Sequence, residues 1–151
     1  MPEHEFSKYF QLFNEIGILE QLSRAMLEAR LPTGLLASHF SVINHLIRVQ
    51  DGRTPVELAR AFQVAKTTMT HTLSGLEKHG FIEMRANPDD KRSKCVWLTD
   101  QGRAFRQNAI RGLEPDFHNL LDALSPEDID ATLPNLTKLR MFMDKARDKP
   151  S

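Results

Sequence analysis

The sequence predicts a mainly helical protein with one small β-hairpin, and two observations support that prediction. Apolar residues recur at helical spacing through most of the 151-residue chain. Between residues 81 and 98, two short apolar stretches instead flank a charged loop that contains proline, a pattern typical of a hairpin. With 40% hydrophobic and 26% charged residues, the chain is long enough to bury a core of its own.

We expect a cytoplasmic protein without structural disulfides. The N-terminal residues MPEHEF lack the basic and apolar regions of a signal peptide, and proline, glycine and polar residues interrupt the run Leu31–Ile47, which contains no Asp, Glu, Lys or Arg. The single cysteine, Cys95, cannot form an intramolecular disulfide or a multi-cysteine zinc site. We therefore expect no membrane segment, no cofactor and no metal.

Residues 6–27 predict a helix that is apolar on more than one side. Its large apolar residues are Phe6, Tyr9, Phe10, Leu12, Phe13, Ile16, Ile18, Leu19, Leu22, Met26 and Leu27. This is too many for one narrow stripe. We expect one side to pack against the same chain and the other against a partner subunit; burial wholly inside the monomer is the alternative.

A second helix is predicted to begin with Thr33 as its N-cap, after the break at Leu31–Pro32, and to end at Asp51–Gly52. Its core residues are Phe40, Ile43, Leu46 and Ile47. The uncharged middle of this helix brings polar groups near the first helix, where a small ligand could bind. Ordinary core or surface polar groups are the alternative.

Two short helices follow, over residues 54–62 and 65–79. Thr54-Pro55-x-Glu57 combines an N-cap, a proline at the first helical position and a capping-box glutamate. The second helix closes at Gly80 and buries Met69, Leu73 and Leu76. Its other sides are short and polar, a composition that permits close approach to bases in a major groove, although a solvated helix face is the alternative.

The hairpin is predicted to pair Phe81–Arg85 with Lys94–Leu98 around the charged tip 87–93. A basic tip can enter the minor groove of DNA, or can simply keep a protein in solution. The formal net charge is zero, yet residues 52–106 hold ten Lys/Arg against six Asp/Glu. A helix pair followed by a hairpin with a basic tip is the layout of a winged helix-turn-helix.

The C-terminal third is predicted to be helical. Thr99 is a candidate N-cap, and Pro115 predicts a kink or break near Leu113–Glu114. Ser125-Pro126-Glu127-Asp128 predicts the start of a last helix, whose pattern Pro134 then interrupts. An apolar seam runs through Phe105, Ala109, Leu113, Phe117, Leu120, Leu121 and Leu124.

Several motifs resemble the MarR family of bacterial transcription regulators over roughly residues 10–145. Asn87-Pro88-Asp89-Asp90-Lys91-Arg92, followed by Val96-x-Leu98-Thr99-x-x-Gly102, is similar to the family's wing and the motif after it. Lys66-Thr67-Thr68-Met69-Thr70 with Leu76-Glu77-Lys78-x-Gly80 resembles its recognition helix, and Phe40-x-Val42-Ile43-x-x-Leu46 its second-helix pattern.

The resemblance implies a homodimeric repressor that binds a pseudo-palindromic operator in double-stranded DNA. Residues 1–32 and 104–151 would form the dimerisation region, and residues 33–103 the DNA-binding region. The implied DNA-binding residues are Lys66, Thr67, Thr68, Thr70, His71, Ser74, Asp90, Lys91, Arg92 and Lys94. A small aromatic or phenolic ligand is also implied, with Phe10, Phe13, His39, His45 and Arg48 as a possible pocket.

This chain departs from the family pattern at His71, where relatives often carry Arg, and at Ser74-Gly75, where they carry Asp-Arg. We therefore expect Asp90 to pair with Lys91, Arg92 or Lys94 of its own hairpin. The alternative function is a redox sensor acting through Cys95, although a buried strand residue is the simpler interpretation. No phosphate-binding loop, nucleophile elbow or H-E-x-x-H motif points to an enzyme.

Overall fold

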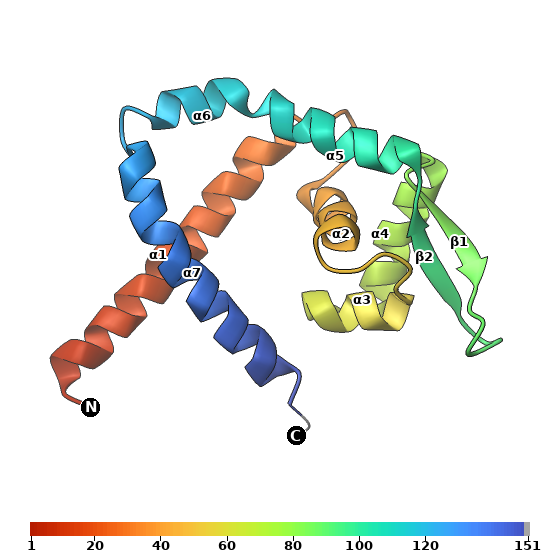
Figure 1. Ribbon diagram of the computed structural model, residues 1–151, viewed down its shortest axis with the longest axis horizontal. Coiled ribbons are helices and arrows are strands. Elements are labelled where there is room, and N and C mark those ends of the chain that lie inside the picture. Colours follow the sequence, from red (N-terminus) through yellow and green to blue (C-terminus); the bar gives the residue numbers. More distant parts are fainter. Residues whose placement is uncertain (150–151) are drawn as a thin grey trace. The chain divides into compact units, whose positions relative to one another are not determined.

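The computed structural model describes residues 1–149 and confirms a mainly helical fold with one antiparallel hairpin (Figure 1). The elements are α1 Glu3–Glu28, α2 Ala37–Arg48, α3 Pro55–Phe62, α4 Lys66–Lys78, β1 Ile82–Ala86, β2 Lys94–Leu98, α5 Asp100–Gly112, α6 Glu114–Leu120 and α7 Pro126–Arg147. They form two compact units, Met1–Leu113 and a second that begins at Glu114. Within residues 1–149, no helix has both the length and the apolar character needed to span a membrane.

The core of the first unit lies among α2, α3, α4, the hairpin and α5. Its most deeply buried large side chains are Val42, Ile43, Leu46, Leu58, Leu76 and Val96. Because every one of these elements contributes to one cluster, the helix pair and the hairpin are held together by apolar burial.

The predicted capping box at the start of α3 is confirmed. Thr54 Oγ1 accepts a hydrogen bond from the Glu57 N–H at 3.2 Å, and Glu57 Oε1 accepts one from the Thr54 N–H at 3.1 Å. The predicted end of α4 is also confirmed, because Gly80 adopts φ +75° just beyond the helix. The N–H groups of Gly80 and Phe81 donate to the carbonyls of Glu77 and Leu76, which satisfies the last turn.

The hairpin pairs Ile82 with Leu98 and continues to Ala86 opposite Lys94. β1 begins one residue later than predicted, because the Phe81 N–H is used to close α4. An isolated bridge pairs Arg53 with Val96. The Gly52 N–H donates to the Val96 carbonyl at 2.9 Å, and the Val96 N–H donates to the Arg53 carbonyl at 2.8 Å. This bridge ties the α2–α3 connection to β2.

The predicted start of α2 at Thr33 is wrong, since the helix begins at Ala37. Two side chains bind the N–H groups at its true start. Nδ1 of His39 accepts from the Leu36 N–H, and Oε1 of Glu28 in α1 accepts from the Ala37 N–H, both at 2.9 Å. Thr33 lies in the turn that precedes this cap.

Thr99 joins the hairpin to α5, and its predicted role as N-cap is confirmed. Its Oγ1 accepts from the Gly102 N–H at 3.1 Å and donates to the Gly80 carbonyl at 2.6 Å. The Gly102 backbone packs directly on the carbonyl of Phe81. The end of α4 and the start of α5 are thus fixed to each other.

The predicted break near Pro115 is confirmed, because α5 ends at Gly112 and α6 begins at Glu114. The predicted start of the last helix at Ser125 is confirmed as well, and Ser125 and Asp128 form a capping box there with bonds of 3.1 and 3.2 Å. The predicted interruption at Pro134 is wrong, since α7 continues through it. The proline removes one backbone donor, and the hydrogen bonds of the turns on either side hold this long helix together.

Helix α1 has no buried residue in the single chain, which contradicts the alternative that it lies wholly inside the monomer core. Phe6, Phe10 and Leu22 keep 63–67% of their surface exposed. The expected packing of one side against the same chain is limited to partial burial, at Ile16 and, toward the end of the helix, at Met26 and Leu27.

Candidate nucleic-acid interface

Helix α4 has one buried side and one exposed side. Met69, Leu73 and Leu76 face the core, each at most 4% exposed. At about 100° per residue, the stripe directly opposite them contains Thr67, His71, Ser74 and Lys78, all exposed. This stripe is free of large apolar side chains and offers hydroxyl, imidazole and ammonium groups to a ligand outside the protein.

Most of the predicted α4 residues belong to that exposed surface, but they are not equivalent. Lys66 lies in the first turn, and Thr70 lies beside the outward stripe. Thr68 instead lies on the flank that faces α2, where it lines a cavity. Lys78 was missed by the sequence analysis, although its spacing of four residues from Ser74 places it on the same stripe.

The middle of α4 approaches α2 closely at Gly75. A Cβ at this position would lie 2.8 Å from His39 Nε2. The Arg that relatives carry here would therefore have no room unless His39 moved. The glycine is explained by the packing of the two helices.

The tip of the hairpin is a compact, internally bonded turn. Asn87 donates through Nδ2 to Ser93 Oγ at 2.9 Å and accepts at Oδ1 from the Asp89 N–H at 3.0 Å. Both sides of the tip are thereby tied together, and Figure 1 shows the tip projecting away from the helices of the first unit. Lys91 and Lys94 are exposed on it.

Asp90 pairs with Arg92 within the same tip. Its Oδ1 accepts from the Arg92 N–H at 2.9 Å and from Arg92 Nε at 3.3 Å. The Arg92 side chain remains 91% exposed. An ion pair this exposed contributes little to stability, so the more useful effect of Asp90 is to orient a guanidinium that projects into solvent.

Aromatic and charged contacts support the hairpin behind its tip. The Arg85 guanidinium lies 5.0 Å from the ring centroid of Trp97 and forms an ion pair with Glu83. Gly52 packs against the face of Trp97 so closely that a Cβ would overlap the ring. The strands are therefore held both to each other and to the α2–α3 connection.

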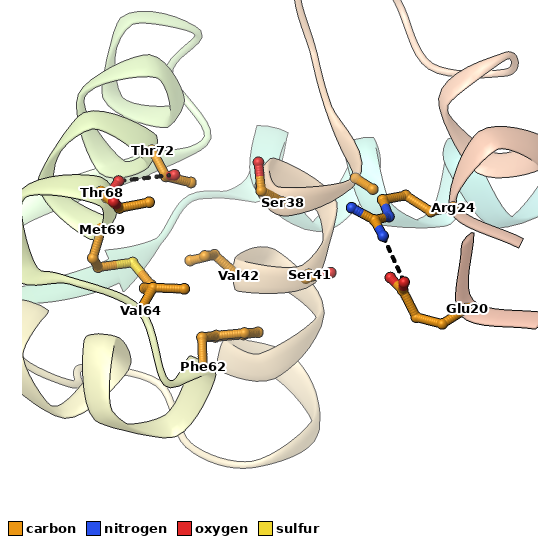
Figure 2. Close-up of a pocket in the computed structure, with 11 residues that line it drawn as sticks. Glu20, Arg24, Ser38, Ser41, Val42, Phe62, Val64, Thr68, Met69 and Thr72 are labelled. Carbon is orange, nitrogen blue, oxygen red and sulfur yellow. Dashed lines mark hydrogen bonds and ion pairs between the residues drawn. The ribbon is translucent and has the colours of Figure 1, made fainter. Parts of the chain in front are cut away.

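A cavity of about 230 Å³ lies among α1, α2, α3 and α4 (Figure 2). Its lining is Glu20, Arg24, Ala37, Ser38, Ser41, Val42, Phe62, Val64, Thr68, Met69 and Thr72. Figure 2 shows Arg24 and Glu20 of α1 paired on one side, at 2.5 Å, and the α4 residues on the other. The volume is below the roughly 300–1,000 Å³ of drug-sized ligand pockets, so a ligand held there would be small.

The structure does not gather the five predicted ligand residues around one cavity. Phe10 and Phe13 are exposed on α1, and Arg48 is exposed at the end of α2. His39 faces Gly75, while the His45 ring packs 5.2 Å from that of Phe62. None of the five lines the cavity of Figure 2 or a second hollow of about 410 Å³, whose lining is Arg30, Pro32, Phe81, Gln101, Ala104, Phe105, Asn108 and Ala109.

Cys95 lies on β2 with 9% of its surface exposed. This agrees with the simpler interpretation of a small buried strand residue, and the burial limits access of an oxidant to the thiol. Among the described residues, His, Cys, Asp and Glu side chains form no group of three or more suited to a metal ion.

The fold and this surface define a winged helix-turn-helix protein, and comparisons with known proteins identify its family. Residues 39–94 match the MarR family. A cysteine-to-serine mutant of MarR from E. coli has 30% identity and a TM-score of 0.71, over 86% of this chain and 96% of that one. The same mutant of E. coli MarR, solved in complex with operator DNA, has 27% identity and a TM-score of 0.68, over 89% of this chain and 96% of that one.

A curated relative is the HTH-type transcriptional repressor YetL from Bacillus subtilis (strain 168), which is 32% identical over 98 residues. The match covers 64% of this chain and 59% of the length of that relative. The chain belongs to the MarR family.

Proposed function

We propose that this chain is a homodimeric repressor that binds a pseudo-palindromic operator through α4 and the hairpin and is released by a small aromatic or phenolic ligand. The observation that carries the proposal is the exposed polar stripe Thr67, His71, Ser74 and Lys78, opposite the core face of the same helix. A helix of about 12 Å diameter fits the major groove, and short side chains permit close approach to base edges.

The hairpin supplies the second contact. Arg92 projects from its tip with its orientation set by Asp90, and Lys91 and Lys94 lie beside it. The minor groove is narrow and strongly negative, so a guanidinium at the tip favours binding there. Asp90 acts by positioning Arg92, while Lys91 and Lys94 attract the backbone phosphates.

A dimer is supported by the apolar surface of the terminal helices. Besides α1, helix α7 leaves Leu133 53% and Phe142 72% exposed. Apolar surface of this extent is typical of an interaction site. A second copy of the chain would cover it and place two α4 helices on one operator, the arrangement that a palindromic site requires. Repression is proposed by analogy with YetL, which is named as a repressor.

The cavity of Figure 2 is the proposed site of the ligand. Its floor is apolar, at Val42 and Met69, while hydroxyls of Ser38 and Ser41 supply hydrogen bonds. Because the cavity is bounded by α4 on one side and α1 on the other, a ligand there could shift the DNA-reading helix relative to the dimerisation helix.

The first experiment selects bound duplexes from random DNA with the wild-type protein, and then titrates the selected duplex by fluorescence anisotropy. Arg92→Ala should weaken binding at least tenfold, while Arg111→Ala, an equal change of charge on α5, should leave it within about twofold. An unchanged affinity for Arg92→Ala would show that the hairpin does not contact DNA. Light scattering of the free protein should give twice the monomer mass.

The ligand is tested with 4-hydroxybenzoate as the probe. It should release the selected duplex from the wild type but not from Ser41→Leu, whose side chain fills the cavity while DNA binding is kept. Equal release from both proteins would place the ligand elsewhere, and no release from either would leave this compound class without support.

A further inference from the structure

The contact between His39 and Gly75 links the start of α2 to the middle of α4. Glycine weakens a helix interior, so its presence on α4 needs a local reason. The reason is the His39 ring, whose Nε2 occupies the space where a side chain at residue 75 would begin, 2.8 Å from an ideal Cβ. The imidazole of His39 therefore fills the space between α2 and α4 at this point.

The other ring nitrogen of His39 performs a second task. Nδ1 accepts a hydrogen bond from the Leu36 N–H at 2.9 Å, which requires that Nδ1 carry no proton. The neutral ring with its proton on Nε2 satisfies this bond. A protonated ring carries a proton on both nitrogens, so it cannot accept from Leu36, and the first turn of α2 loses one of its two caps.

Burial and two neighbouring histidines disfavour the protonated form of His39. The histidines are His71 of α4 and His79, the residue that follows α4, whereas the carboxylate of Glu28 in α1, which accepts from the Ala37 N–H at the same helix start, acts in the opposite direction. Burial lowers the pKa of His39, and repulsion from His79 and His71 lowers it further. The hydrogen bond from the Leu36 N–H to His39 Nδ1 is thus fully formed above the ordinary histidine pKa of about 6.5. It is lost as the pH falls through the lowered pKa of His39.

We propose that His39 is a positioning residue that makes the placement of α4, and with it operator binding, sensitive to acid. Protonation of His39 removes a cap from α2 and puts a cation against α4, so as the pH falls the protein binds DNA more weakly than a variant whose residue 39 does not titrate. The proposal rests on the proposed function in one respect, namely that α4 is the DNA-reading helix.

The test compares the wild type with His39→Gln. Residue 39 occupies the third helical position of α2, where a glutamine side chain also accepts from the N-cap N–H and does not titrate. Both proteins keep His71 and His79, so they differ only at residue 39. Any difference in pH dependence between the two proteins is due to His39.

Anisotropy titrations use the duplex selected by the wild type at pH 7.5. At pH 7.5 the two proteins should bind within about twofold of each other. At pH 5.5 His39→Gln should bind about fivefold more tightly than the wild type, the factor that corresponds to one ordinary hydrogen bond. Parallel pH profiles for the two proteins would overturn the proposal.

A second measurement needs no DNA. An NMR titration of the wild type should show the His39 ring titrating below a solvent-exposed histidine, and His39→Gln should lose less thermal stability than the wild type between pH 7.5 and 5.5. If no duplex is selected at all, the proposed function fails while this measurement still decides the role of His39. An ordinary titration of the His39 ring would refute the inference even if the glutamine variant did not fold.

Discussion

Substitution of Gly102 by alanine should destabilise the protein, although alanine is the better helix former. Gly102 lies in the first turn of α5, where a Cβ would overlap the carbonyl oxygen of Phe81 and lie 3.1 Å from its carbonyl carbon. Both obstructing atoms belong to the backbone, so no side-chain rotation relieves the overlap. The two segments must separate.

The magnitude follows from three contributions. Alanine gains up to about 1 kcal/mol of helix propensity, while overpacking costs about 1–3 kcal/mol. Separation also strains the bonds from Thr99 to Gly80 and Phe81, 2.6 and 3.2 Å long, each of which contributes about 1 kcal/mol. The net loss is roughly 2 kcal/mol, which lowers Tm by about 4–8 °C in a protein of this size.

Thermal unfolding followed by circular dichroism measures this effect, with Gly112→Ala as the matched control. Gly112 ends the same helix, and a Cβ there would meet only Arg30 Cβ at 3.7 Å, an ordinary contact. The control should keep or slightly raise Tm. If Gly102→Ala raised Tm as well, the close approach of Phe81 to α5, and with it the joint between hairpin and helix, would be refuted.

Two further predictions concern pH and oxidation. The backbone hydrogen bond from Thr54 lowers the pKa of Glu57. The Glu57 carboxylate therefore stabilises the fold fully above the ordinary pKa of a glutamate, and this stabilisation is lost as the pH falls through the lowered pKa. Glu57→Gln should show a shallower fall of Tm in acid than the wild type, and an equally steep fall would contradict this. The peptide that contains buried Cys95 should keep its mass after mild peroxide, whereas oxidation of Cys95 with loss of DNA binding would favour the redox-sensor alternative.

The sequence predicted those features whose partners are close along the chain. Thr54, Thr99 and Ser125 were each recognised as N-caps because the donor lies three residues away. Gly80 was recognised for the same reason, since the left-handed residue directly follows its helix. The helix pair and the hairpin therefore followed from local patterns.

The start of α2 could not be predicted because its caps are unusual. One comes from Glu28, nine residues earlier in a different helix, and the other from an imidazole at the position where glutamate or glutamine is expected. The bridge between Arg53 and Val96 was missed because a single paired residue leaves no alternating pattern.

The exposure of the candidate DNA-binding residues on α4 could be predicted from the sequence, but the neighbouring elements that each residue faces could not. Exposure of the polar α4 residues followed from helical periodicity, yet the place of Thr68 in the lining of the cavity of Figure 2 depends on where α2 lies. The ligand residues were harder to predict, because His39 and His45 point to partners within the fold. Helical spacing places a residue on a face but does not identify what that face meets.

Binding of the selected duplex by Ser74→Glu tests the central claim, that the outward face of α4 reads DNA. Ser74 is exposed at the middle of the stripe, and glutamate is at least as good a helix former as serine, so the fold should be kept. The control is Gln107→Glu, which adds the same charge at an exposed position of α5. We predict that Ser74→Glu loses at least a hundredfold in affinity while Gln107→Glu stays within about threefold; equal affinities of the two variants would contradict the assignment of α4 as the reading helix.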